Sequence, residues 1–497
     1  NYISPGKFAL DNAVVKDGEL NPEYAGYQAI VINNEIKMNL ENAQKILDYA
    51  KAGLSIVLIG TTPTQDDSFG VNDDTAVAAI FAELKTLDNV TSIVDESSLP
   101  TALKSLGVEP SASFENSQKI SVQHRYTQDS DLYYLYNNSS SNDYGSNDLY
   151  HNDANTINTT VTLEGAGMPY AMNLWTGDIT PIMEYTNNGD GTISMDISIM
   201  DNEAMVIGIT DDPSYFGQKA QETATSKQGD GTIISTDHGV VYRTTNVGDY
   251  SVALGENSYT GKVEEIAGTQ LLQTGWNLTV TSWEPGEKAL LAKDDPNYDA
   301  RDINRRELDS IALDELKPWN EIEGLQDISG QGFYTNTFIV DGNFDGAYLD
   351  LGESYDNILE VTLNGQVLPA IDQFNHILDL GSYLVPGENT LTIRTGTTLA
   401  AAVRKAGGNV GSTDTSKVYP TTYGLLGDIS ITPYVDVVLQ DDTNSSETPS
   451  TPPNSSEETQ TPSSPTPSEQ TPTTGDAFPI ALAVGAVLVA GTTVLVI

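Results

Sequence analysis

The sequence predicts a multidomain protein that combines one α/β domain with several all-β domains. Strand-like and helix-like segments alternate over residues 1–115, which is typical of a parallel sheet with helical connections. From residue 116 to about 436, alternation with a period of two dominates instead, which is typical of antiparallel sheets. The chain has 497 residues, too many for one ordinary hydrophobic core.

The expected α/β domain, residues 1–115, has strand patterns at 27–32, 54–60 and 90–94 and helix patterns at 40–52, 75–87 and 99–106. The strands are almost wholly apolar, so we expect helices on both faces of the sheet in a flavodoxin-like or amidotransferase-like arrangement. No Gly-x-Gly-x-x-Gly follows any of these strands, so nothing favours a nucleotide site.

Four further segments complete the expected domain order. We expect a β-sandwich at 116–275, a helical or irregular connector at 276–319 with its best helix at 301–312, and a second all-β domain at 320–436. Residues 437–474 are nearly all Ser, Thr, Pro, Glu, Asp, Gln and Asn, so they predict a disordered stalk. Residues 477–497 carry no charge and are long enough for a transmembrane helix, within a final segment of 475–497.

Composition excludes several functions. The chain has 70 acidic and 23 basic residues and a formal net charge of −47, which argues against nucleic acid and against an anionic membrane surface as partners. It has no Cys, so a disulfide, a thiolate nucleophile and a Cys-ligated metal are impossible. Its four His are far apart and lack zinc-site spacing.

The C-terminal order of stalk, short motif and apolar segment resembles the sorting signal of Gram-positive surface proteins. Sortase recognises Leu-Pro-x-Thr-Gly there, and Pro472, Thr474 and Gly475 match, with Thr471 in place of Leu. The resemblance implies sortase and peptidoglycan as partners and an extracellular, wall-anchored location, with membrane contact only through the terminal span. A simple membrane tail behind a stalk is the alternative. Because export needs a signal and the chain starts at Asn1, we expect further sequence upstream.

Residues 320–436 resemble the galactose-binding-like jelly roll appended to glycoside hydrolases. The phrases are Gly330-Gln331-Gly332-Phe333-Tyr334, Leu349-Asp350-Leu351-Gly352, Val361-Thr362-Leu363-Asn364-Gly365 and Pro386-Gly387-Glu388-Asn389. With the α/β domain, His124-Arg125 and Leu174-Trp175-Thr176-Gly177-Asp178, residues 1–436 resemble the C-terminal half of bacterial α-L-rhamnosidases of glycoside hydrolase family 106. That resemblance implies an upstream catalytic (β/α)₈ barrel, inversion by two carboxylates, and a calcium cofactor.

No catalytic residue is assigned to this chain. Inverting hydrolysis needs two carboxyl groups across a sugar-sized cleft. Glu164 and Glu184 flank the Trp175 loop, but surface or turn roles are favoured for both. Candidate substrate contacts are His124, Arg125 and Trp175. For the first two, the alternative is a structural pair that holds Asp129 or Asp131; for the Trp, it is a core or interdomain position.

One segment has a partial calcium-loop pattern. Asp341, Asn343 and Asp345 fit the first positions, but the twelfth is Gly352 where a bidentate Glu is needed, so a hairpin turn is favoured.

The sequence therefore predicts an accessory region of a cell-surface, α-L-rhamnosidase-like glycoside hydrolase that meets a carbohydrate substrate. A non-catalytic glycan-binding adhesin and a hydrolase of other specificity are the alternatives. The fragment itself is expected not to turn over aryl rhamnosides.

Overall fold

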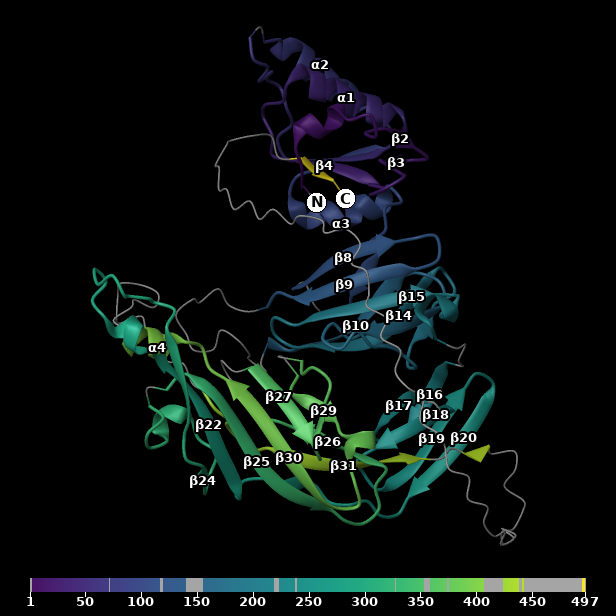
Figure 1. The fold of residues 1–497 in the computed structure, drawn as a ribbon. Coiled ribbons are helices and arrows are strands. Elements are labelled where there is room, and N and C mark those ends of the chain that lie inside the picture. The colour runs from purple at the N-terminus through teal and green to yellow at the C-terminus, as the bar shows by residue number, and fades with distance from the viewer. Residues whose placement is uncertain are drawn as a thin grey trace, which may run out of the picture. The chain divides into compact units, whose positions relative to one another are not determined.

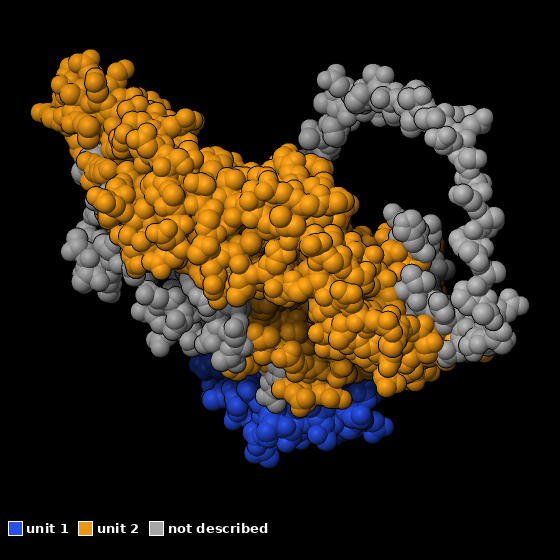
Figure 2. Space-filling model, turned by 90° about the horizontal axis from the view of Figure 1, so that it is seen from below, with its two compact units in different colours: residues 1–110, 451–497 blue, residues 111–450 orange. Residues whose placement is uncertain are grey.

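The computed structural model describes residues 2–70, 72–116, 119–139, 155–218, 223–236, 239–326, 328–352, 358–372, 375–405, 423–437, 440–441 and 494–496. It has two compact units, residues 1–110 with 451–497 and residues 111–450, shown in separate colours in Figure 2. Each unit is described here by itself.

The first unit is an α/β sheet with helices on both faces (Figure 1). Strands β4 (Ala29–Asn33), β5 (Ser55–Ile59) and β6 (Val90–Ile93) are parallel, as expected from the alternation of strand and helix patterns. Helices α1 (Leu40–Lys51) and α2 (Asp74–Leu84) cover one face, and α3 (Leu99–Ser105) covers the other. A small hairpin, β2 (Val15–Lys16) and β3 (Glu19–Leu20), precedes the sheet.

Alternating side chains explain why this sheet has two cores. Ile30 and Ile56 pack with α1 and α2, whereas their neighbours Val31 and Val57 pack with Ala102 of α3. Every residue of β5 is buried, as expected for a central parallel strand.

The C-terminal apolar segment is described only at Val494–Val496. These residues form strand β33, which pairs antiparallel with β4 and with β1 (Tyr2–Ile3), so this end of the predicted span is a strand. Among the residues that the structure describes, no helix is long and apolar enough to cross a membrane. The stalk beyond residue 441 and the sorting motif at Pro472, Thr474 and Gly475 lie outside the described residues.

The second unit begins with a β-sandwich that ends at residue 210, whereas the predicted sandwich extended over 116–275. One sheet has the order β13-β14-β10-β7 and the other β12-β11-β15-β9-β8, with buried residues such as Leu135, Val161 and Ile207 between them. The strands are β7 (Ala112–Phe114), β8 (Ile120–Tyr126), β9 (Asp131–Asn137), β10 (Ile157–Glu164), β11 (Met168–Met172), β12 (Ile179–Pro181), β13 (Thr186–Asn187), β14 (Thr192–Ile199) and β15 (Ala204–Thr210).

A second group of strands follows, and we call its four-stranded sheet, β16-β19-β20-β32, the middle sheet. One face of it carries buried Tyr250, Val252 and Leu254. The strands of this group are β16 (Ala224–Gln228), β17 (Thr232–Thr236), β18 (Gly239–Thr244), β19 (Gly248–Leu254), β20 (Asn257–Val263), β21 (Gln270–Leu271) and β32 (Gln440–Asp441).

The last β unit packs two sheets around a core that includes Trp276, Trp319 and Tyr334. One sheet has the order β23-β22-β25-β30-β27-β28, and β31, β26 and β29 lie in the other. The elements are β22 (Trp276–Pro285), β23 (Ile303–Glu307), β24 (Ile311–Leu313), β25 (Gly330–Val340), β26 (Gly346–Asp350), β27 (Ile358–Leu363), β28 (Gln366–Val367), β29 (Ile377–Asp379), β30 (Gly387–Gly396), α4 (Ala400–Lys405) and β31 (Ser430–Val437).

The helix predicted at 301–312 is wrong, because β23 and β24 occupy this segment and both pair with β22. All five residues of β23 are exposed, so its sequence lacks the alternation that marks a half-buried strand. Cross-strand contacts hold it: the Arg305 guanidinium lies 5.0 Å from the Trp283 ring, and Arg306 lies 3.4 Å from Glu284.

Strand β31 joins the last β unit to the preceding group of strands. Its first residues pair with β26 and β21, and its final residues pair with β18. At this junction Arg243 of β18 donates two hydrogen bonds to Asp436, of 2.7 and 2.8 Å, and one of 2.6 Å to Asp379. Its guanidinium lies 3.8 Å from the centre of the Tyr434 ring, whose hydroxyl donates to Asp379 at 2.8 Å. We call these four residues the Arg243 cluster.

The ionisation of the Arg243 cluster follows from its burial. Burial favours the neutral form of the arginine, but the hydrogen bonds of Asp436 and the surrounding negative charges outweigh it and raise the pKa of Arg243. Burial also raises the pKa of Tyr434, and the neighbouring Asp379 adds to the effect, so this phenol stays a neutral donor.

Candidate carbohydrate-contact surface

The strand β8 places His124 and Arg125 on opposite faces of their sheet, because successive side chains of a strand alternate. His124 is directly opposite Tyr133 of β9, and the two rings stack with centroids 4.3 Å apart and an angle of 7°. Its Nε2 lies 2.8 Å from Asp131 Oδ1, and its side chain is 18% exposed. This contact with Asp131 matches the structural role predicted for His124 as the alternative to substrate contact. His124 therefore contacts other residues of the protein on the core side of the sheet.

Tyr133 fixes the inner face beside this histidine. Its hydroxyl donates a 2.7 Å hydrogen bond to the backbone carbonyl of Glu164. Burial, with the charges of Asp131 and Glu164, raises the pKa of Tyr133, so the phenol remains protonated at any physiological pH. The stack of His124 on a neutral phenol therefore supports the sandwich edge structurally.

Arg125 lies on the outer face, where it is exposed. The register aligns it with Leu132 of β9, and aligns the preceding outer residue of β8, Gln123, with Tyr134. Tyr134 is 43% exposed, so its ring is available on the surface. We call Gln123, Arg125 and Tyr134 the open face of the sandwich.

The other end of the same sheet face is covered. Phe216 follows β15 and packs edge-on against Tyr170 of β11, with ring centroids 5.3 Å apart. Tyr170 belongs to the core that also contains Tyr250 of the middle sheet. Gly208 of β15 is closely packed, since a Cβ there would lie 2.5 Å from Met172 Cε and 2.7 Å from Phe216 Cζ, so a larger residue would displace these side chains. This outer face is thus closed over β11 and open over β8 and β9.

Trp175 lies in the loop between β11 and β12 and is 42% exposed, so a position in the protein core is wrong for this residue. The Asn173 side chain accepts hydrogen bonds from the backbone N–H groups of Trp175 and Thr176, at 2.8 and 3.1 Å. Thr176 donates to Asp178 at 2.6 Å, and Gly177 takes a positive φ of 81° to close the turn. The exposed indole is thereby carried on a loop with its own hydrogen-bond network.

These positions suit carbohydrate recognition chemically. Tyr and Trp side chains bury large area with few rotatable bonds, and their faces accept the C–H groups of a sugar ring. Arg125 and Gln123 add hydrogen-bond donors next to Tyr134. The loop of Trp175 begins directly after Met172 of β11. Met172 is aligned with Val206 of β15, which in turn is aligned with Tyr134 of β9. Met172 and Tyr134 are therefore separated by about 10 Å of sheet, two strand spacings, and Trp175 lies in the loop that starts after Met172.

The two glutamates near this loop make separate local contacts. Glu164 is exposed at the end of β10, and its backbone carbonyl receives the Tyr133 hydroxyl. Glu184 forms a 2.8 Å ion pair with Lys227. The contact of Glu164 is made by its backbone, and that of Glu184 by its carboxylate.

The calcium-loop pattern forms the connection between β25 and β26. These strands lie in different sheets and do not pair, so the hairpin predicted here is wrong. Asp341 accepts from the N–H of Gly342, Asn343 donates to the carbonyl of Glu265, and Asp345 accepts from the N–H of Asp436. The three side chains thus serve protein partners, which does not favour calcium here. Across the described ranges, no group of three or more His, Asp or Glu side chains is suited to hold a metal ion.

Part of the chain matches the model of a known protein family. A family model described as alpha-L-rhamnosidase matches residues 3–148. No match is found among curated proteins.

The fold of the chain also resembles those of solved structures. The chain resembles a rhamnosidase from Novosphingobium sp. PP1Y with a TM-score of 0.54 and 19% identity, over 85% of this chain and 35% of that one. Two further structures are more distant. An FMN-binding beta-glucuronidase from Facaelibacterium prausnitzii L2-6 has a TM-score of 0.20 and 19% identity, over 34% of this chain and 23% of that one. A Beta-D-Mannosidase from Dictyoglomus thermophilum has a TM-score of 0.20 and 14% identity, over 33% of this chain and 22% of that one. The fold is therefore rhamnosidase-like, and this chain spans about a third of the length of the Novosphingobium enzyme.

Proposed function

We propose that this chain is an accessory, carbohydrate-contacting region of a rhamnosidase-like glycoside hydrolase. Its role is to hold a glycan containing rhamnose, while hydrolysis is carried out by another part of the enzyme. The observation that carries the proposal is the pair of solvent-exposed aromatic positions, Tyr134 and Trp175, on one sheet of a rhamnosidase-like fold.

Charge and chemistry support the same ligand class. A formal net charge of −47 disfavours anionic polymers, while Gln123 and Arg125 beside Tyr134 supply donors for neutral hydroxyl groups. The fold likeness covers a third of a rhamnosidase, which is the size expected of a supporting part. A non-catalytic adhesin would bind glycans through the same surface. The two functions differ in that only the accessory region would act together with a hydrolytic domain.

Binding of the full 497-residue chain to a rhamnose-containing oligosaccharide tests the proposal. Trp175→Ala and Tyr134→Ala are each expected to weaken binding about fivefold to tenfold, because each removes one ring contact. Tyr24→Ala is the matched control, since Tyr24 is an exposed tyrosine of the first unit at 69% exposure. Equal affinity of all four proteins would refute the surface, and turnover of an aryl rhamnoside by this chain would refute the accessory role.

We also propose that the chain is anchored outside the cell by sortase. The support is the sequence order of stalk, Pro472, Thr474, Gly475 and uncharged segment. Incubation with sortase and a glycine nucleophile should give cleavage between Thr474 and Gly475, detected by mass spectrometry. A Gly475→Ala variant is the control, and an uncleaved natural chain would contradict anchoring.

A further inference from the structure

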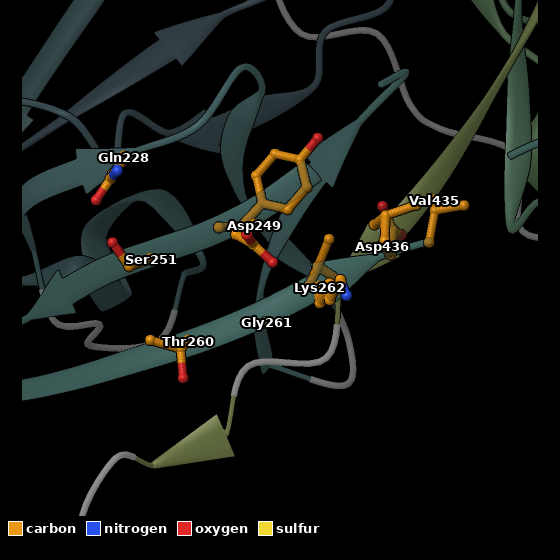
Figure 3. A pocket seen from close by; sticks show the side chains of 11 residues that line it. Gln228, Asp249, Ser251, Thr260, Gly261, Lys262, Val435 and Asp436 are labelled. Atoms are coloured by element: carbon orange, nitrogen blue, oxygen red, sulfur yellow. The ribbon is translucent and has the colours of Figure 1, made fainter. Parts of the chain in front are cut away.

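The middle sheet carries a polar groove on the face opposite its buried core. Figure 3 shows side chains from β16, β19, β20 and β31 lining this groove, whose volume is about 780 Å³. Sites for small ligands commonly have about 300–1,000 Å³, so the groove is large enough for a bound molecule. Its polar lining residues are Gln228, Asp249, Ser251, Thr260, Lys262 and Asp436.

The strand register explains this lining. Gln228, Ser251 and Thr260 are aligned across β16, β19 and β20 and form one row. Asp249 and Lys262 form the next row, about 7 Å further along the strands. Tyr250 between these rows turns to the other face, where its hydroxyl donates to the carbonyl of Asn246 at 2.6 Å. The groove therefore offers two rows of hydrogen-bonding groups.

Two of the three charged lining residues of the groove, Lys262 and Asp436, have ion partners within the protein. Lys262 Nζ lies 2.9 Å from Glu264 Oε1, and this hydrogen bond, with the charges of Glu264 and Asp249, raises the pKa of Lys262. Asp436 is held by both nitrogens of the Arg243 fork. Neither of these two charges needs an outside counterion, and Asp249 adds a negative charge that disfavours an anion. The groove therefore favours a neutral ligand rich in hydroxyl groups over an anionic one.

We propose that this groove is a second carbohydrate-binding site, which takes neutral glycosyl residues by hydrogen bonding. It is distinct from the open face and the Trp175 loop, because it lies on different strands and offers no exposed aromatic ring among its lining residues. The proposal shares with the proposed function only the class of ligand.

The test compares two valine substitutions on one sheet face of the full chain. Ser251→Val removes a hydroxyl from the centre of the groove, and Ser258→Val makes the same change one row outside it. Calorimetry with a neutral rhamnose-containing oligosaccharide should show about fivefold weaker binding for Ser251→Val, the cost of one hydrogen bond, and no change for Ser258→Val. To isolate the groove, both changes are made in a chain that also carries Trp175→Ala and Tyr134→Ala.

Hydrogen exchange gives the location independently. Added oligosaccharide should protect the amides of 248–263, and a charged oligogalacturonide of equal length should not. Unchanged affinity of Ser251→Val, or equal protection by the charged probe, overturns the groove proposal. Loss of binding only in the Trp175 and Tyr134 variants would also overturn it while leaving the proposed function intact. Residual binding that survives those variants and depends on Ser251 would support the groove as a second site.

Discussion

Replacing Arg243 with methionine should destabilise the second unit strongly. The change keeps an unbranched apolar stem but leaves Asp436 and Asp379 without their cation. Arg243 is 13% exposed at its side chain and Asp436 is 21% exposed, so water replaces the lost partner poorly.

The size of the loss follows from the contacts. Two charge-assisted hydrogen bonds to Asp436 contribute about 3 kcal/mol together. Asp379 is 45% exposed, so its bond adds only about 0.5 kcal/mol. The stacking of the guanidinium on Tyr434 adds about 1 kcal/mol, and the whole agrees with the 3–5 kcal/mol typical of breaking a buried pair. We therefore expect a loss of about 4 kcal/mol in the free energy of unfolding.

Urea unfolding followed by tryptophan fluorescence measures this loss, because Trp276 and Trp319 are buried in the last β unit. Arg394→Met is the control: its ion pair with Glu360, at 3.0 Å, is exposed at both ends and should cost less than about 1 kcal/mol. Arg243→Lys, which keeps the charge but loses the planar fork, should fall between the two. If Arg243→Met cost no more than Arg394→Met, the Arg243 cluster would not hold the two β groups together.

Three further predictions concern stability. The hydroxyl of Ser68, the N–H of Asp73 and other donors lower the pKa of Asp66 to about 2, below its unfolded value of about 3.9. That contribution is present above pH 4 and is lost as pH falls toward 2, so circular dichroism should show a weaker acid transition of the first unit in Asp66→Asn. Gly208→Ala should cost about 1–3 kcal/mol by overpacking, whereas Gly396→Ala, with open space around it, should not, and a thermal shift in both alike would contradict the contact. Asn39→Ala removes the cap that accepts the N–H of Asn42 at 2.8 Å and should cost about 1 kcal/mol, which hydrogen exchange in α1 would report.

Local patterns predicted the first unit and most β-strands well. Runs such as 54–60 are buried on both faces, and Leu132-Tyr133-Tyr134-Leu135 alternates strictly, so period and burial agree. The segment 301–312 failed because an exposed edge strand carries charges on both faces, and its long side chains have good helix propensity. Cross-strand contacts to Trp283 decide its conformation, and these are not local.

The candidate site was predictable only in part. Arg125 and Trp175 were named from the sequence, and alternation alone assigns Tyr134 to the face opposite Tyr133, a signal that was available but unused. The separation of His124 from Arg125 follows from the same alternation. The groove was not predictable, because its rows exist only once β16, β19 and β20 are in register.

Strand β31 has a consequence for how the molecule is made. A ribosome produces it about 190 residues after β18, so roughly 10–40 s pass before the edge of β18 can be closed. During that delay β18 offers unpaired backbone groups to other nascent chains. A gene fragment ending before residue 430 would make the delay permanent, and its product should precipitate even though every strand of the preceding sandwich is present.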